Sequence, residues 1–114
     1  MPAKRKITED EMRLLDFLIK KAKLKLPANW KENLMVKSMD DAGMGSLVLY
    51  PKEIAKDERE FGSAASEIEF KDEDRKDVIA SLNLDEAGEI FELDIWKTTF
   101  DPLIRIPKTF SDAD

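Results

Sequence analysis

The sequence VIASLNLDEAGEIFELDIWK, residues 78–97, decides the fold of this chain. Apolar residues occupy every second position on both sides of Glu86-Ala87-Gly88, which is the pattern of two strands that each bury one face. The alternating apolar residues are Val78, Ala80, Leu82 and Leu84 before the turn, and Phe91, Leu93 and Ile95 after it. The pattern therefore predicts an antiparallel hairpin whose second strand covers residues 89–97.

Three upstream stretches have the same period of two and predict further strands: residues 34–39, 46–50 and 63–71. The first two flank Asp40–Gly45, a turn with two glycines that can adopt positive φ. Residues 52–62 leave two alternatives open. They form either a short helical turn, with Ile54, Ala55 and Phe61 facing inward, or an irregular acidic loop.

The N-terminal end has a different period. Thr8 and Glu11 have the spacing of a capping box, in which each side chain accepts the backbone N–H of the other residue. Behind them, apolar residues recur at steps of three and four, which predicts an amphipathic helix over about residues 8–24 that ends before Pro27. A helix followed by consecutive strands predicts an α+β fold, with the N-terminal amphipathic helix packed on an antiparallel meander sheet of about five strands.

At 114 residues the chain has the length of one domain, residues 1–114. We expect its ends, residues 1–6 and 108–114, to be frayed. The segment 98–107 contains two prolines and is expected to pack as an extended stretch. No stretch has the roughly 18 apolar residues of a membrane span, and no signal-type apolar run follows the basic first residues, so we expect a soluble, cytoplasmic protein that contacts no membrane.

The composition excludes several chemistries. The chain has no His and no Cys, which removes imidazole bases, thiol nucleophiles, disulfides and His or Cys metal ligands. Asp, Glu, Lys and Arg make up 39% of the residues, and their charges are unevenly placed. Residues 1–39 hold ten basic and five acidic side chains, whereas residues 40–114 hold nine and twenty. Because an acidic majority repels phosphate, nucleic acid is a poor partner for this chain.

Two motifs are similar to ligand-binding loops, and we interpret both as turns. Gly43-Met44-Gly45-Ser46 lacks the helix that must follow a phosphate-binding loop, because a strand follows it instead. The stretch from Asn83 to Asp94 has the Gly and part of the ligand spacing of a calcium loop. It lacks a ligand at the fifth position, ends in Asp where a bidentate Glu is needed, and is flanked by strands. We therefore expect no metal ion and no cofactor, and we assign no catalytic residue.

The most suggestive group is Glu92, Asp94 and Trp96, which the period of two places on one face of the last strand. Three interpretations are open. The acids lie on a solvated face with Trp96 covering its neighbours, or they form a protein-recognition surface with Trp96 as an anchor, or they act as an acid/base pair in a pocket. Glu67 and Glu69, from a possible neighbouring strand, extend this candidate interaction surface.

Several motifs resemble those of a family of small uncharacterised bacterial proteins: MDDAGMGSL (39–47), SLNLD (81–85) and ELDIWK (92–97), followed by Phe100, Pro102 and Leu103. The resemblance covers about residues 8–107 and rests on an MGSL turn and an ELDxWK strand. It implies no particular activity. The ELDxWK strand and the FxPL segment after it are also similar to the C-terminal strands of several immunity proteins of bacterial toxin systems, and this second resemblance implies an immunity-type binding role.

The leading hypothesis is therefore a small, soluble, non-enzymatic domain that binds a basic protein, in an immunity-type role against a toxin-like effector. One alternative is a carboxylate-based ligand-binding or hydrolytic domain that uses Glu92 and Asp94. Another is a homo-oligomeric structural unit in which apolar residues such as Ile79 and Ile90 pair across a dimer. A closed pocket around the two carboxylates favours the ligand hypothesis, and a flat acidic sheet face favours protein binding. The oligomeric state is left open.

Overall fold

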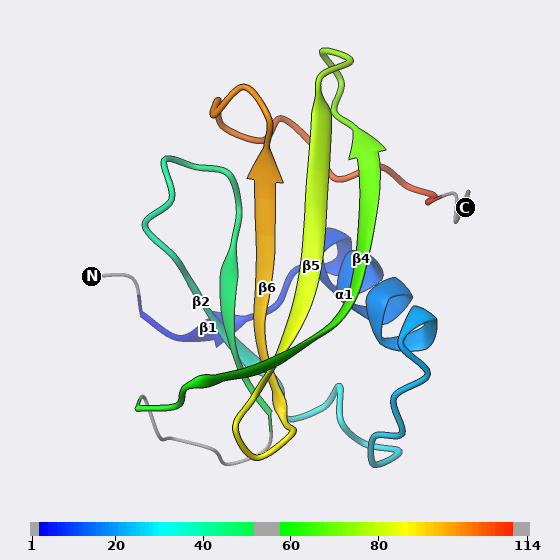
Figure 1. Cartoon of the computed structure of the whole chain (residues 1–114), viewed down its shortest axis with the longest axis vertical. Coiled ribbons are helices and arrows are strands. Elements are labelled where there is room, and N and C mark those ends of the chain that lie inside the picture. The colour runs from blue at the N-terminus through cyan, green and yellow to red at the C-terminus, as the bar shows by residue number, and fades with distance from the viewer. Residues whose placement is uncertain (1–2, 52–57, 111–114) are drawn as a thin grey trace.

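The computed structural model describes residues 3–51 and 58–110, in which one helix packs on a six-stranded antiparallel sheet (Figure 1). The elements are β1 (Arg5–Lys6), α1 (Glu9–Lys21), β2 (Met35–Ser38), β3 (Leu47–Tyr50), β4 (Phe61–Lys71), β5 (Asp77–Asp85) and β6 (Ile90–Lys97). The α+β class and the N-terminal helix predicted from the sequence are confirmed. The sheet has slightly more strands than the sequence predicts, because β1 adds to one edge.

The strands run across the sheet in the order β1-β2-β3-β6-β5-β4. Hairpin turns join β4, β5 and β6, but β6 lies beside β3, and the chain after β3 crosses to the opposite edge of the sheet to begin β4. This arrangement of β3 to β6 is a Greek key and differs from the strand order of a simple meander. Alternation predicts which side chains face the core, but it does not determine which strand edges pair.

The connection from β3 to β4 is the part for which the sequence left two alternatives. Residues 52–57 lie outside the described residues. Phe61, which one alternative placed inward, is 59% exposed and begins β4 two residues before the predicted strand start at Ser63.

α1 begins where the capping box predicts. Thr8 Oγ1 accepts the N–H of Glu11 at 3.1 Å, and Glu11 Oε1 accepts the N–H of Thr8 at 3.0 Å. The buried residues of the helix, Leu14, Leu15, Leu18 and Ile19, form the side that packs on β4 and β5. The helix ends at Lys21, because Lys23 takes a positive φ of 58°. No helix within residues 3–51 and 58–110 is long and apolar enough to cross a membrane.

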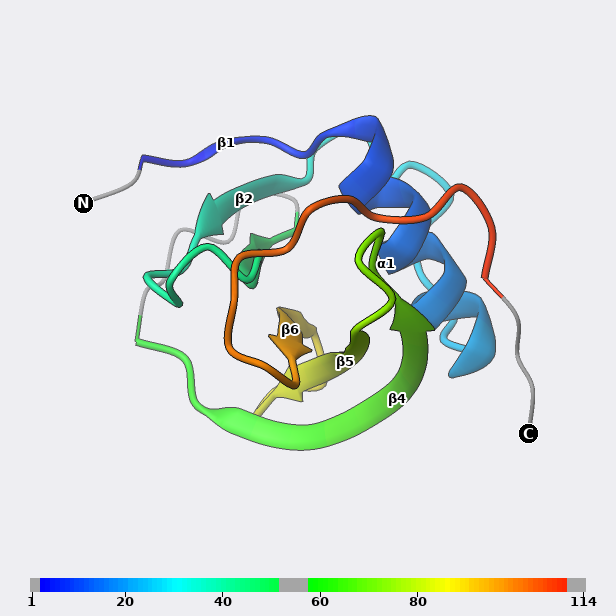
Figure 2. The same ribbon diagram turned by 90° about the horizontal axis from the view of Figure 1, so that it is seen from above.

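The sheet is bent, and its concave side holds the core. Seen from above, β4 curves around β5 and β6, while α1 covers the open side (Figure 2). Two irregularities in the β4–β5 register, at Phe61/Ser63 and Ala64/Ser66, fall in this bent strand, and such bulges bend strands. The core residues that the sheet contributes are Val36, Leu47, Leu49, Ile68, Phe70, Val78, Ala80, Leu82, Ile90, Leu93 and Ile95.

A further register shift reverses the expected facing of Ile90. Between Asn83 and Leu84 the β5–β6 pairing slips, so that Asn83 is aligned with Glu92 but Leu84 with Ile90. Ile90 is consequently 1% exposed and belongs to the core. The expectation that Ile90 lies on the second sheet face is wrong, and a dimer cannot use it as a contact residue.

The segments that the sequence predicts to fray, residues 1–6 and 108–114, include described residues that make contacts. Arg5–Lys6 forms β1, which pairs with β2. At the other end, the ring of Phe110 lies 5.3 Å from that of Phe17 and 5.8 Å from that of Phe70. The tail that leads to Phe110 crosses over the end of the core (Figure 2). Sheet pairing therefore holds Arg5 and Lys6, and aromatic packing holds Phe110.

Candidate functional site

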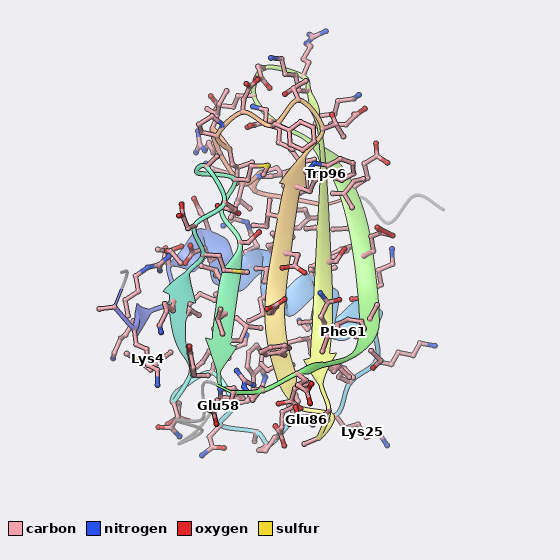
Figure 3. The ribbon with its side chains drawn as sticks, turned by 60° about the vertical axis from the view of Figure 1, so that its left-hand side comes forward. Lys4, Lys25, Glu58, Phe61, Glu86 and Trp96 are labelled. Carbon is pink, nitrogen blue, oxygen red and sulfur yellow. The ribbon has the colours of Figure 1, made fainter. Side chains whose placement is uncertain are left out.

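The sheet surface that faces away from α1 carries the residues that the sequence predicts as a candidate interaction surface. We define this acidic face by Glu67 and Glu69 of β4 and by Glu92, Asp94 and Trp96 of β6. The two β4 acids are exposed, the two β6 acids are half-buried, and Trp96 is 44% exposed. Figure 3 looks onto this face, with Trp96 in front of the sheet and α1 behind it.

The acidic face spans three strands. β5 lies between β4 and β6, so the two strands that supply the carboxylates are not direct neighbours. With strands about 4.8 Å apart, the β4 acids lie roughly 10 Å from the β6 residues in the same row. The register gives two cross-strand rows: Glu67, Ser81 and Asp94, and Glu69, Ile79 and Trp96. The predicted residues therefore form one continuous surface.

Glu92 and Asp94 are coupled within this surface. The side-chain amide of Asn83 donates to Asp94 Oδ2 at 2.6 Å, and the two carboxyls share a hydrogen bond. Burial, the charge of Asp94 and this hydrogen bond raise the pKa of Glu92. Burial also raises the pKa of Asp94, although its bonds with Asn83 and Glu92 oppose that rise. Burial is thus the first cause of the raised pKa of both carboxyls, and their interaction raises the pKa of Glu92 and opposes the rise for Asp94.

The surface beside Asp94 is an open depression of about 290 Å³. Its lining residues are Ala64, Ala65, Ser66, Glu67, Ser81, Asn83 and Asp94. Only one of the two coupled carboxyls lines it, and it opens to solvent on the outside of the sheet. A shallow groove of this kind favours contact with a side chain of another protein over enclosure of a small substrate.

Replacing Glu92 by Gln is expected to remove a pH dependence of stability. A carboxyl with a higher pKa in the folded chain stabilises the fold only while protonated, so this contribution is lost as pH rises from about 4.3, the unfolded value, through the folded pKa. Gln keeps a donor for Asp94 at every pH. The melting temperature of Glu92→Gln should match the parent near about pH 4 and exceed it near about pH 7. Circular dichroism at a series of pH values checks this, with Glu67→Gln as the exposed control; parallel profiles would contradict it.

Sequence reasoning missed Lys97, which follows Trp96 and points to the opposite face. Its side chain is fully buried, and Nζ donates to Asp72 Oδ2 at 2.7 Å, to Asp74 Oδ2 at 2.8 Å and to the Pro102 carbonyl at 3.3 Å. Burial would lower the pKa of Lys97, but the bonds with Asp72 and Asp74 raise it. The period of two does predict that Lys97 points inward, because Lys97 lies two residues after the buried Ile95 on β6.

Asp72 joins this lysine to the C-terminal tail. Its carboxylate accepts the backbone N–H groups of Ile104 at 2.8 Å, Arg105 at 3.0 Å and Glu73 at 2.7 Å. Burial would raise the pKa of Asp72, but the bonds from Lys97 and from these N–H groups hold it below its ordinary value. One carboxylate thus fixes the end of β6, the β4–β5 turn and the tail relative to one another.

A second buried ion pair lies toward the other end of the sheet. Arg59 Nη1 is 3.2 Å from Asp85 Oδ2, and both side chains are almost fully buried. The guanidinium also donates to the carbonyls of Ile90 and Leu49. It lies over the ring of Phe91, 4.7 Å from the ring centroid. No periodic signal in the sequence marks Arg59, because it precedes β4 in the irregular connection.

The two motifs that are similar to ligand-binding loops are turns, as the sequence predicts. Asp85 Oδ1 accepts the N–H groups of Ala87 and Glu89, each at 2.9 Å, and so closes the β5–β6 turn. In the β2–β3 turn, Asp41 accepts the N–H of Ser46 at 2.8 Å, and β3 follows directly.

Comparison with known families identifies a family model that covers most of the chain. A family model described as a domain of unknown function, DUF6984, matches residues 4–107. No curated protein and no solved structure matches the chain. The family match agrees with the resemblance to uncharacterised proteins that the motifs indicate.

Proposed function

Because this chain belongs to the DUF6984 family of domains of unknown function, we propose its function from the geometry of the acidic face: it is a soluble, cytoplasmic, non-enzymatic domain that binds a basic protein there. Its role is of the immunity type, in which the domain covers the basic surface of a toxin-like effector. The observation that supports this proposal most is an exposed tryptophan on a sheet face, among carboxylates that form no salt bridge within residues 3–51 and 58–110.

Within the described part of the chain, the carboxylates of the acidic face are not held in salt bridges. Across residues 3–51 and 58–110, the ion pairs include none of its four carboxylates. At the end of β4, by contrast, Lys71 pairs with Asp77 at 2.6 Å. Unpaired carboxylates on one face create a negative potential that speeds encounter with a basic partner and disfavours acidic ones. An aromatic anchor such as Trp96 then supplies apolar contact area.

The same geometry argues against hydrolytic chemistry. Glu92 and Asp94 stand on one strand and hydrogen-bond to each other. A hydrolytic pair needs its carboxyls on either side of the substrate, about 5–9 Å apart, with the reacting bond between them. The coupled pair lies against the sheet beside a shallow groove, so a non-enzymatic role is the better proposal.

The test of this function begins with the genomic neighbour. We expect the product of the adjacent gene, expressed with a tagged copy of this chain, to co-purify and to be basic. Calorimetry should show a steep loss of affinity between about 50 mM and about 300 mM salt, because the attraction acts between solvent-exposed charges. A neighbour product that does not bind, or that binds equally well at both salt concentrations, contradicts the proposal.

Charge-reversal variants test whether the acidic face is the surface that binds the partner. Glu67→Lys/Glu69→Lys is expected to weaken binding at least about tenfold, mainly by slowing association. Glu9→Lys/Glu32→Lys changes the net charge by the same amount at two exposed acids, one on α1 and one in the connection to β2. This control should keep the parent affinity within a factor of about two. An equal loss in both double variants would mean that net charge, and not the acidic face, governs binding.

A further inference from the structure

Phe100 has two features that folding does not require. Its side chain is 65% exposed, more than the other exposed large apolar residues of the described chain, and its φ is +62°. A bulky residue in the left-handed region is strained, and Gly normally takes such a turn position. An exposed ring gains little from burial, so nothing in the folded core offsets this strain. Strained residues of this kind concentrate at functional sites.

The ring of Phe100 lies against that of Trp96. The two ring centroids are 5.9 Å apart, and the ring planes are inclined by 56°. The turn that carries Phe100 is held firmly: the Phe100 N–H donates to the Lys97 carbonyl at 2.8 Å, and the Thr98 N–H donates to the Asp77 carbonyl at 3.0 Å. With the Lys97 side chain buried on the other side, the two rings form a preformed pair at the end of β6. Because the two rings are already ordered before binding, little conformational entropy is lost when a partner binds to them.

Carboxylates flank this aromatic pair. Glu69 lies in the same cross-strand row as Trp96, and Asp94 precedes Trp96 by two residues on the same face. A guanidinium group suits this combination, because it stacks on aromatic rings and donates N–H bonds to carboxylates at the same time. An ammonium group is a compact, strongly hydrated charge and gains less from the rings.

We propose that the Trp96–Phe100 pair binds an arginine side chain of the basic partner. The guanidinium stacks on the exposed surface of the two rings and donates to Glu69 or Asp94. This inference rests on the proposed function and specifies the residue type that the acidic face selects. In this proposal Phe100 occupies a position that favours Gly because its ring completes the binding surface.

Two acetylated and amidated hexapeptides of equal charge, hexa-arginine and hexa-lysine, serve as probes. The chain has two tryptophans, and Trp96→Phe assigns the Trp96 indole N–H signal in a nuclear magnetic resonance spectrum by its loss. Hexa-arginine should shift this signal and bind roughly two- to fivefold more tightly than hexa-lysine, the gain expected for an exposed cation–π contact. Equal affinity for the two peptides would overturn the inference.

Phe100→Gly separates binding from folding. Gly accepts the positive φ, so the melting temperature should stay level or rise, while the preference for hexa-arginine is lost. Phe100→Tyr keeps a ring and should keep the preference. Phe61→Ala removes another exposed aromatic, at the start of β4, and should also keep it. Retention of the preference in Phe100→Gly would overturn the inference.

Failure of the inference and failure of the proposed function give different results. If Glu67→Lys/Glu69→Lys abolishes binding of both peptides but Phe100→Gly changes nothing, the acidic face binds cations without the aromatic pair, and only the inference fails. If neither peptide binds, the proposed function fails as well. If sedimentation shows a dimer that Phe100→Gly dissociates, the aromatic pair is a contact between two copies, and the inference is overturned.

Discussion

Asp72→Ala is expected to lower the free energy of unfolding by about 3–5 kcal/mol, the loss typical of breaking a buried ion pair. The Asp72 side chain is 0% exposed and 2.7 Å from Lys97 Nζ. Its removal leaves the buried ammonium with Asp74 and the Pro102 carbonyl, and it deprives three backbone N–H groups of their acceptor. Because a domain of this size is stable by about 5–15 kcal/mol, urea denaturation should show a marginally folded variant.

Two further variants show whether the loss comes from the buried pair. Asp101→Ala removes a carboxylate from the exposed pair with Lys76 and should change stability little. Asp72→Asn keeps some of the acceptor geometry, so its free energy of unfolding should lie between those of Asp72→Ala and Asp101→Ala. Because the pKa of Asp72 is lowered, its contribution is present above about pH 3.9 and is lost as pH falls through the folded pKa, so Asp72→Asn should also flatten the acid side of the stability profile. Equal stability of Asp72→Ala and Asp101→Ala would contradict this account.

Arg59→Met is expected to cost about 3 kcal/mol and to lower the melting temperature by roughly 10 °C or more. Met fills a similar volume, but it leaves the buried carboxylate of Asp85 without a cation and the carbonyls of Ile90 and Leu49 without the guanidinium donors. It also removes the cation from the face of Phe91. Thermal unfolding followed by circular dichroism measures the effect.

The matched control is Arg105→Met. Arg105 is 54% exposed and 3.4 Å from Glu73, so its loss should stay within about 0.5 kcal/mol. In Arg59→Met/Asp85→Asn the second substitution removes the unpaired charge, and the double variant should be more stable than Arg59→Met alone. A double variant that loses the sum of the two single effects would mean that the pair does not act as a unit.

Most of the elements are predictable from the sequence, because each follows a local rule. The capping box predicts the start of α1, and the period of two predicts the inward residues of β5 and most of β6. Lys97 follows the same rule, although a charged residue at an inward position is unexpected. A buried lysine requires carboxylate partners, and buried Asp72 and exposed Asp74 supply them from the turn beside it. Charged residues at inward positions therefore predict internal ion pairs.

The features that the sequence does not predict depend on contacts between residues that are far apart in the sequence. Ile90 turns inward because the β5–β6 register slips by one residue, and alternation carries no sign of such a shift. The strand order is set by the edge with which β6 pairs. Arg59 lies outside every periodic segment, and its burial depends on partners from three different strands.

The candidate site, too, is only partly predictable from the sequence. Glu92, Asp94 and Trp96 share a face as the period predicts, and Glu67 and Glu69 lie on that face with β5 between. Phe100 is in a turn, where side-chain direction follows from a positive φ and not from spacing. Its pairing with Trp96 therefore needs three-dimensional structure to be found.

Chemical-shift mapping of the isotopically labelled chain with hexa-arginine tests the central claim most directly, because it reports on the backbone N–H groups of the whole chain in one titration. We expect the perturbed N–H groups to belong to the outward residues of β4, β5 and β6 and to the turn that carries Phe100, and the perturbations to fade as salt is added. Perturbations centred on α1 or on the connection between α1 and β2, or scattered over exposed acids regardless of face, would contradict the claim.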